Sequence, residues 1–163
     1  MRACRSAALL VLLLVACSPP SEAQTAAQGL LQRADAAYSS GNRELAKSLY
    51  RAVLASDPDN SRAAFQLARL SPPGSAEAVA LLRRYVKLEP GDPWGYMALG
   101  DALATAGAVA EAIGQYGQAR RRAPGESDVY TGLGRILRDA GRTDELIETC
   151  EEWVLRQPSN ASA

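Results

Sequence analysis

The sequence of 163 residues contains no histidine, three cysteines, two tryptophans and one phenylalanine. Without histidine the chain lacks the commonest general base, the catalytic triads that depend on it and the ligand found in most zinc sites. A glycine-rich phosphate loop of the Walker type is missing as well. These absences argue against an enzyme, and we expect no catalytic residue, no cofactor and no metal site.

Neither sign of charge is in excess, since 18 basic residues balance 18 acidic ones. A nucleic-acid-binding domain normally has a basic excess, so we expect no nucleic-acid partner. The one basic run, Arg120-Arg121-Arg122, precedes Pro124 at the end of an expected helix, where the helix dipole favours cations. We expect a structural or solvated role for this run, and a solvated helix face for the four glutamates between positions 145 and 152.

The N-terminal segment 1–17 has the pattern of an export signal. Arg2 and Arg5 form a basic start, and the apolar run 7–16 is too short to span a bilayer. The segment ends in Leu14-Val15-Ala16-Cys17, which resembles the bacterial lipobox, in which the cysteine thiol receives lipid and the chain is cut just before it. An ordinary secretory peptide or an uncut anchor is the alternative.

The lipobox resemblance implies a membrane anchor at Cys17 and a place in the cell envelope. Ser18 stands where lipoproteins retained at the inner membrane generally carry aspartate, so we expect the outer membrane, with the protein facing the periplasm. Residues 18–26 contain Pro19-Pro20 and small polar residues, and we expect them to form a flexible tether.

Residues 93–126 contain a helix-turn-helix pattern that the rest of the chain repeats. Gly107 supplies a turn residue that can adopt positive φ. Pro124 ends the second helix, because the residue before a proline is pushed out of the α region. The residues expected at the close helix crossing, and those expected to fill the space between the helices, are Gly100, Ala112, Leu103 and Tyr116.

Copies of this unit occur on both sides of it. Leu133-Gly134, Gly141 and Pro158 all follow their counterparts at one constant spacing. An earlier copy has the turn, crossing, core and stop residues Gly41, Ala46, Tyr50 and Pro58. Between them lies a degenerate copy, residues 61–92, which is slightly shorter and has Ser71-Pro72-Pro73-Gly74 in place of a single turn glycine.

A period of about 34 residues with small, aromatic and proline residues at fixed places resembles the tetratricopeptide repeat family. The resemblance implies an all-α fold, an α-solenoid of about four helix-turn-helix repeats. Asn60 and Asp92 are expected N-caps, with Pro93 at the first helical position after Asp92. The expected repeats are residues 27–60, 61–92, 93–126 and 127–160.

In this family the first helices of successive repeats line a concave groove that binds protein partners. Large apolar residues beside arginines are typical of interface cores. The resemblance therefore implies that the groove binds an apolar helix or extended peptide of some acidic character; the alternative is that its apolar residues are buried against neighbouring helices. The expected groove residues are Leu31, Tyr38, Arg62, Phe65, Arg69, Trp94, Met97, Asp101, Arg135 and Arg138, with Thr131 at the position of Met97 in the last repeat.

One known ligand mode of the family is not expected. Chaperone-docking members hold a terminal carboxylate with lysine at the fifth and asparagine at the ninth place of their first repeat. Leu31 and Asp35 occupy those places here, and the Asp35 carboxylate would repel such a ligand.

The last repeat has an outer face with no following helix in the sequence. Cys150 stands at the place of Tyr116, so we expect it to be a buried core residue rather than a reactive thiol. We expect part of this C-terminal face, made of Leu146, Cys150, Trp153 and Val154, to be open and covered by a partner or a second copy. The alternative is that Trp153 folds back towards Leu133 and Leu137.

These features together indicate a lipid-anchored envelope scaffold for protein–protein interaction. Its fold and anchor resemble those of pilotin and pilus-assembly lipoproteins, which escort or stabilise secretin channels. Two alternatives remain open. One is an accessory subunit of an envelope assembly or polysaccharide-export complex, and the other is a self-associating structural lipoprotein.

Overall fold

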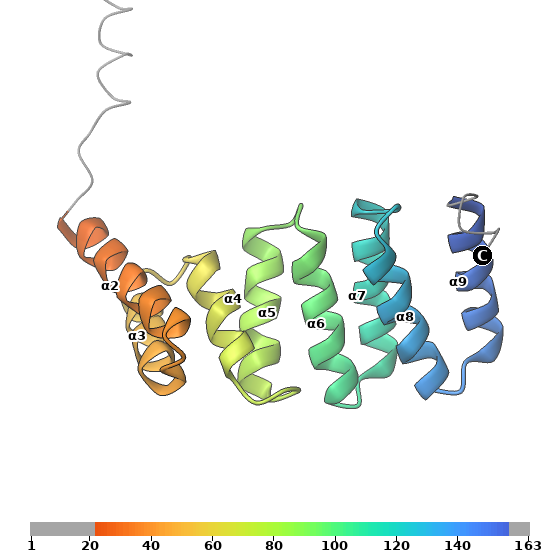
Figure 1. The fold of residues 1–163 in the computed structure, drawn as a ribbon, viewed down its shortest axis with the longest axis horizontal. Helices are drawn as coiled ribbons and strands as arrows, with labels where there is room; N and C mark the ends of the chain where they lie inside the picture. The colour runs from red at the N-terminus through yellow and green to blue at the C-terminus, as the bar shows by residue number, and fades with distance from the viewer. Residues whose placement is uncertain (1–21, 157–163) are drawn as a thin grey trace, which may run out of the picture.

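The computed structural model describes residues 22–156, which form eight α-helices arranged as a row of antiparallel pairs (Figure 1). No strand occurs in this range, so the predicted all-α solenoid is confirmed. Cys17, the lipobox and the first part of the expected tether lie outside the described residues. The helices are α2 (Glu22–Ser39), α3 (Arg43–Ser56), α4 (Ser61–Leu70), α5 (Ala76–Leu88), α6 (Pro93–Thr105), α7 (Val109–Arg122), α8 (Ser127–Asp139) and α9 (Thr143–Arg156).

Each expected repeat contains one helix pair, but the first pair begins earlier than predicted. Helix α2 starts at Glu22, so residues 22–26 of the expected tether are helical. The sequence there is rich in glutamate, glutamine and alanine, which favour helix without needing a buried face. Low apolar content was therefore a poor reason to expect a tether at these positions.

The turns within the pairs depend on glycine at positive φ. Gly41, Gly107 and Gly141 have φ of 78°, 83° and 68°, as their spacing predicted. In the degenerate repeat Gly74 takes this role, with φ of 70°. Gly74 also touches the next repeat, because a Cβ built on it would lie 2.9 Å from Thr105 Cγ2 and 3.0 Å from the Ala106 nitrogen.

The predicted N-caps are present. The Asn60 side chain accepts a hydrogen bond from the Ala63 amide at 2.9 Å, and the Asp92 carboxylate accepts one from the Trp94 amide at 3.0 Å. Pro93 is the first residue of α6. These bonds satisfy amides that the helices themselves leave unpaired.

The core lies between the two helices of each pair and between successive pairs. Tyr50 and Tyr116 are fully buried, and Ala46 and Ala112 have no exposed surface where their helices cross the partner helix. A Cβ on Gly100 would lie 2.6 Å from the Tyr116 ring, which explains the small residue there.

The tyrosine of one repeat also packs on a glycine of the next. A Cβ on Gly132 in α8 would collide with the Tyr116 hydroxyl group and lie 2.6 Å from its Cε1 atom. Gly95 in α6 is covered in the same way by the Tyr85 ring. The sequence pattern drew attention to Gly100 but gave no role to Gly132.

Two arginines of the basic run at the end of α7 have structural contacts, whereas Arg121 is exposed, and both outcomes fall within the prediction of a structural or solvated role. The Arg122 guanidinium lies 4.0 Å from the centre of the Tyr96 ring and donates to the Pro90 carbonyl oxygen at 2.5 Å. Arg120 forms a 2.7 Å ion pair with Glu152 of α9. The run therefore ties α7 to the helices before and after it.

Candidate protein-interaction surfaces

The first helices of the pairs share one surface of the solenoid, on which the expected groove residues lie. Two shallow hollows mark the joints between neighbouring first helices. The hollow between α4 and α6 has a volume of about 250 Å³, and the one between α6 and α8 about 340 Å³. We call this surface the groove.

The apolar groove residues differ in exposure. Trp94 is 48% exposed, whereas Leu31, Tyr38 and Phe65 are half-buried. Met97 is only 9% exposed and belongs to the core, which corrects the prediction that it is an accessible groove residue. The Met97 side chain packs against neighbouring helices, which agrees with the alternative that apolar residues at this repeat position are buried.

Aromatic packing explains the position of Phe65. Its ring lies 4.7 Å from the Tyr85 ring, and the two planes are inclined by 39°. The exposed Arg69 guanidinium lies 5.7 Å from the Tyr38 ring centre and 6.0 Å from that of Phe65. An arginine among aromatic rings is a typical feature of protein interfaces.

Asp101 connects three helices. Its carboxylate accepts a 2.9 Å hydrogen bond from the Tyr116 hydroxyl group of α7 and forms a 2.5 Å ion pair with Arg135 of α8. Burial and the Asp101 charge raise the pKa of Tyr116 well above its ordinary value. The phenol therefore remains a protonated donor over the whole physiological range.

The first repeat contains the same arrangement. Tyr50 of α3 donates to Asp35 at 2.7 Å, and Arg62 of α4 lies 3.0 Å from the same carboxylate. Asp35 and Asp101 thus each join their own repeat to the next one. The sequence pattern did not show that the charges of Asp35 and Asp101 are neutralised by Arg62 and Arg135.

Among the described residues the C-terminal face is partly open, and its coverage by a partner or a second copy stays a prediction. A hollow of about 570 Å³ lies between α8 and α9. Val154 is 48% exposed, while Leu146 and Trp153 are half-buried. The Trp153 ring packs on Tyr130 of α8 at 4.6 Å between centroids, so Trp153 does fold back onto its own pair, though it contacts Tyr130 first.

Cys150 is exposed, which contradicts the prediction that it is buried. Its counterpart Tyr116 is covered by α8, but no helix among the described residues covers the outer side of α9. The buried residue at this point is Thr149, whose hydroxyl group donates to the Glu145 carbonyl oxygen at 2.7 Å. Repeat position alone therefore did not determine burial.

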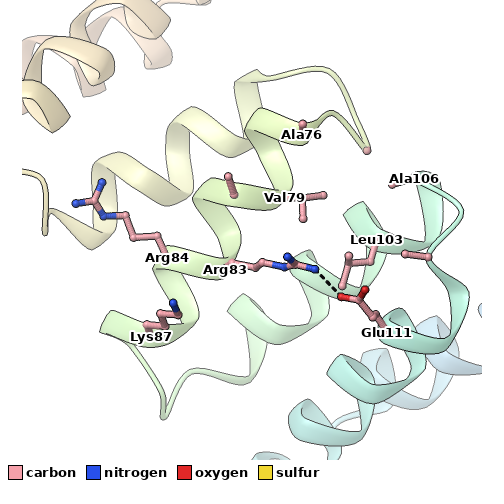
Figure 2. Close-up of a pocket in the computed structure, with 11 residues that line it drawn as sticks. Ala76, Val79, Arg83, Arg84, Lys87, Leu103, Ala106 and Glu111 are labelled. Atoms are coloured by element: carbon pink, nitrogen blue, oxygen red, sulfur yellow. Dashed lines mark hydrogen bonds and ion pairs between the residues drawn. The ribbon is translucent and has the colours of Figure 1, made fainter.

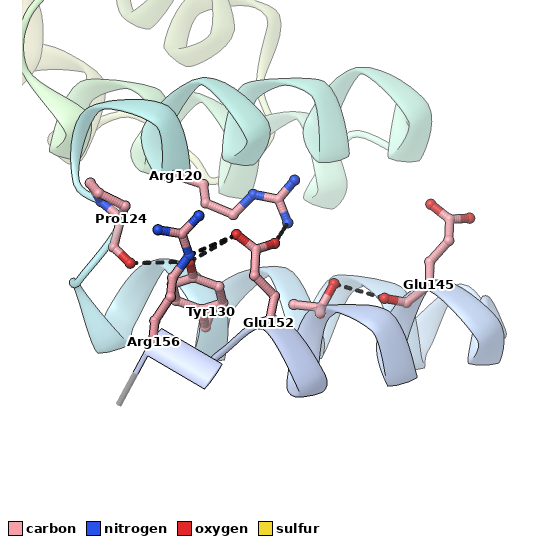
Figure 3. Close-up of polar contacts among 7 residues, drawn as sticks. Arg120, Pro124, Tyr130, Glu145, Glu152 and Arg156 are labelled. Atoms are coloured by element: carbon pink, nitrogen blue, oxygen red, sulfur yellow. Dashed lines mark hydrogen bonds and ion pairs between the residues drawn. The ribbon is translucent and has the colours of Figure 1, made fainter. Parts of the chain in front are cut away.

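Glu152 also departs from expectation. The sequence predicts a solvated side chain at this position, yet the Glu152 side chain is only 30% exposed. Figure 3 shows it among three partners: it pairs with Arg120 at 2.7 Å and Arg156 at 2.9 Å, and accepts from the Tyr130 hydroxyl group at 3.3 Å. Glu152 therefore links α9 to α7 and α8.

A further hollow that the sequence did not predict lies between α5 and α7. Its volume is about 640 Å³, and Val79 and Leu103 contribute apolar surface to it. Figure 2 shows Arg83 of α5 reaching Glu111 of α7 in an ion pair of 2.5 Å, while Arg84 and Lys87 lie farther along α5. The hollow thus has a basic rim along α5.

Neither a metal centre nor a membrane span was found in the part of the chain that the structure describes. Residues 22–156 contain no group of three or more metal-binding side chains close enough to share an ion. No helix in the same range has both the length and the hydrophobicity to cross a bilayer.

Solved structures with the same fold include proteins of different kinds. The chain is similar to a mutant of the Thermobaculum terrenum O-GlcNAc transferase, with 29% identity and a TM-score of 0.63 over 73% of this chain. It spans only 23% of that enzyme. It is also similar to MamA, with 25% identity and a TM-score of 0.69, over 77% of this chain and 74% of MamA.

A third similar structure is the first tetratricopeptide domain of Spaghetti (RPAP3), which was solved with the HSP90 peptide SRMEEVD. It has 20% identity and a TM-score of 0.63, over 71% of this chain and 93% of that domain, and at this identity it supports the fold alone. Comparison with curated proteins gives no significant match.

The family pattern described as tetratricopeptide repeat matches residues 31–71, 74–126 and 97–162. These segments include helices α3 to α9 and residues 31–39 of α2, and they contain the residues of both surfaces described above. Such repeats form scaffolds for protein–protein interaction, which agrees with a surface of exposed aromatic and arginine side chains. The chain therefore belongs to the tetratricopeptide repeat family.

Proposed function

We propose that the chain is a lipid-anchored scaffold of the bacterial cell envelope that binds a protein partner in its groove. The observations that carry this proposal are exposed Trp94 at the start of α6, and exposed Arg69 with half-buried Phe65 on α4, where Arg69 lines the hollow between α4 and α6. Tryptophan, arginine and tyrosine dominate the binding energy of most protein interfaces. The proposal assigns no catalysis to the chain.

The groove is tested by changing Trp94. A Trp94→Ser variant should lose most of its partner capture, because an anchor residue acts through contacts with the partner. Its melting temperature should change little, since half of the side chain is already in water. A matched control is Leu45→Ser, which removes an apolar side chain of similar exposure (45%) from the second helix α3.

Membranes from cells that express each full-length variant would be crosslinked, and captured proteins would be identified by mass spectrometry. We expect the partner to disappear with Trp94→Ser and to remain with Leu45→Ser. Equal capture by both variants would contradict binding at the groove. A fall in melting temperature that accounts for the lost capture would show that Trp94 is a core residue instead.

The proposed anchor is the Cys17 thiol, supported by the sequence Leu14-Val15-Ala16-Cys17. Cys17→Ser should abolish incorporation of a fatty-acid analogue, whereas Cys150→Ser should leave it unchanged. Separation of the membranes would then test the proposed outer-membrane location. Label on the Cys17→Ser variant at the wild-type level would reject the anchor.

Within the envelope, we propose secretin or pilus assembly as the system that the scaffold serves. The support is the combination of a small helical-repeat domain with a lipid anchor, which pilotins share. A secretin subunit among the crosslinked partners would support this role. Enzymes of polysaccharide export or assembly-complex subunits in its place would support the accessory-subunit alternative.

Self-association is a second candidate because of the residues exposed on α9. Ile147, Val154 and Leu155 are 51%, 48% and 82% exposed, and Val154 lines the hollow of the C-terminal face. Sedimentation velocity over a range of concentrations should show dimers that Val154→Glu removes. Quenching of Trp153 fluorescence in a Trp94→Phe background would show whether this face is covered. A monomer at all concentrations with accessible Trp153 would reject self-association.

A further inference from the structure

Arg69 differs from the other charged residues at its place in the repeat. The ninth position of each repeat is charged and alternates in sign along the groove: Asp35, Arg69, Asp101 and Arg135. Asp35 is paired with Arg62, and Asp101 with Arg135. Within the described residues, Arg69 forms no ion pair with a carboxylate, and its nearest polar partner is the Gln66 side-chain oxygen at 3.4 Å.

Two aromatic rings hold the Arg69 guanidinium, and neither neutralises its charge. The rings of Tyr38 and Phe65 lie 5.7 and 6.0 Å from it, on α2 and α4. Contacts with ring faces restrict the side chain but leave most of its five N–H donors free. An exposed arginine held in this way loses less conformational freedom when it binds a carboxylate.

An apolar hollow adjoins this cation. Arg69 lines the 250 Å³ hollow between α4 and α6, whose other walls include Ala68, Leu82, Ala98 and Ala102. Alanines on both facing helices leave room for a large apolar side chain from outside. Asp101 stands at the far wall, and its charge is already offset by Arg135.

We propose that the partner's groove-binding segment contains an acidic side chain that pairs with Arg69 and a nearby large apolar side chain that enters this hollow. This inference rests on the proposed groove function and specifies the chemistry of its partner. Arginine binds a carboxylate through two parallel hydrogen bonds, which suits a fixed guanidinium. Arg62 and Arg135 are paired with Asp35 and Asp101, so among these described charges only Arg69 has no carboxylate partner. A single unpaired cation suits a side-chain carboxylate within a segment rather than a clamp for a chain terminus.

The test uses the full chain in detergent micelles and a phage library of short random peptides. Selected peptides would be synthesised with both ends blocked, and their affinity measured by fluorescence anisotropy. We expect the selected peptides to share an aspartate or glutamate beside a large apolar residue. Replacement of that acidic residue by its amide should weaken binding about tenfold or more.

Variants of the protein separate the charge of Arg69 from general charge. Arg69→Gln should weaken binding about tenfold, and the amide-substituted peptide should then lose no further affinity, as expected for two groups that interact directly. Arg69→Lys should fall between, because lysine keeps the charge but not the planar fork. Arg121→Gln is the matched control, since it removes an exposed arginine from the second helix α7 and should have no effect.

Three outcomes would overturn the proposal. Peptides whose binding is lost with Trp94→Ser but kept with Arg69→Gln would reject the acidic contact and leave the groove function standing. Peptides that bind only with a free terminal carboxylate would reject a side-chain ligand. If no peptide binds in a way that depends on Trp94, both the inference and the proposed function fail.

Discussion

The third and fourth repeats are built alike, yet their second helices have different environments. Helices α6 and α8 have 13 residues each, and α7 and α9 have 14 each. Tyr116 of α7 is 1% exposed because α8 covers it, whereas Cys150, at the same place in the next repeat, is exposed. The comparison shows that a repeat of this fold completes its core only when a neighbour packs on its second helix.

The largest expected effect comes from removing the side chain at these two equivalent positions. Tyr116→Ala should lower the free energy of unfolding by about 3 to 5 kcal/mol, as large buried aromatics do. Cys150→Ala should change it by less than about 0.5 kcal/mol, because the residue is exposed. Urea unfolding followed by circular dichroism and by tryptophan fluorescence measures both. Similar losses for the two variants would mean that α9 is covered as α7 is.

A second pair of variants tests the contact between repeats. Gly132→Ala places a methyl group against the fully buried Tyr116 ring and should cost about 1 to 3 kcal/mol. In Gly134→Ala the new methyl group contacts only Leu146 Cδ1, at 3.4 Å. Because alanine favours helix more than glycine does, the free energy of unfolding should rise by up to about 1 kcal/mol. Thermal melts of the two variants should therefore shift in opposite directions. Equal shifts would show that the ring of Tyr116 can move aside.

The third test compares ion pairs at the joint and at the open end. Glu152→Gln weakens a link to Arg120 of α7, with both side chains about one-third exposed, and should cost about 1 kcal/mol. Glu145→Gln breaks the contact with Arg142 near the start of α9, where both side chains are more exposed, and should cost about 0.5 kcal/mol or less. Chemical denaturation in low and high salt should show the larger effect for Glu152.

The smallest effect concerns the joint between the first two repeats and depends on pH. Arg51 donates a hydrogen bond of 2.8 Å to the Glu77 carboxylate. This hydrogen bond lowers the pKa of Glu77 below its ordinary value of 4.5. Because the folded state favours the charged form, this stabilisation is complete above pH 4.5 and is lost as the pH falls below it. The Glu77 side chain is 39% exposed, so solvent screening keeps the effect well under about 1 kcal/mol. Melting temperatures of Glu77→Gln and the wild type should converge in acid; a constant difference would contradict the linkage.

The fold could be predicted because its signals are local and periodic. The turns at Gly107 and Gly141 require only a residue that adopts positive φ. The N-caps Asn60 and Asp92 require only the amides in the first turn of the helix that follows each of them. These requirements hold whatever packs nearby. The helix pairs and their turns therefore followed from spacing alone.

The candidate surfaces were less predictable because burial and pairing depend on neighbouring helices. Met97 and Cys150 were assigned by repeat position, and each turned out opposite in exposure to its expectation. The pairing of Asp101 with Arg135 joins residues of two different repeats, and no local pattern signals it. The isolation of Arg69 became visible only once the partners of the other groove charges were known.

The contact at Gly74 has a mechanical consequence. The resistance of a helical solenoid to bending depends, at each joint between repeats, on the atoms that are in contact across that joint. In the turns within the helix pairs, a Cβ on Gly41, Gly107 or Gly141 would meet nothing within 4 Å. Gly74, in contrast, lies against Thr105 and Ala106 of the next repeat. The joint between the second and third repeats therefore resists compression at that end, and a partner that bends the solenoid would do so chiefly at the joints on either side of it.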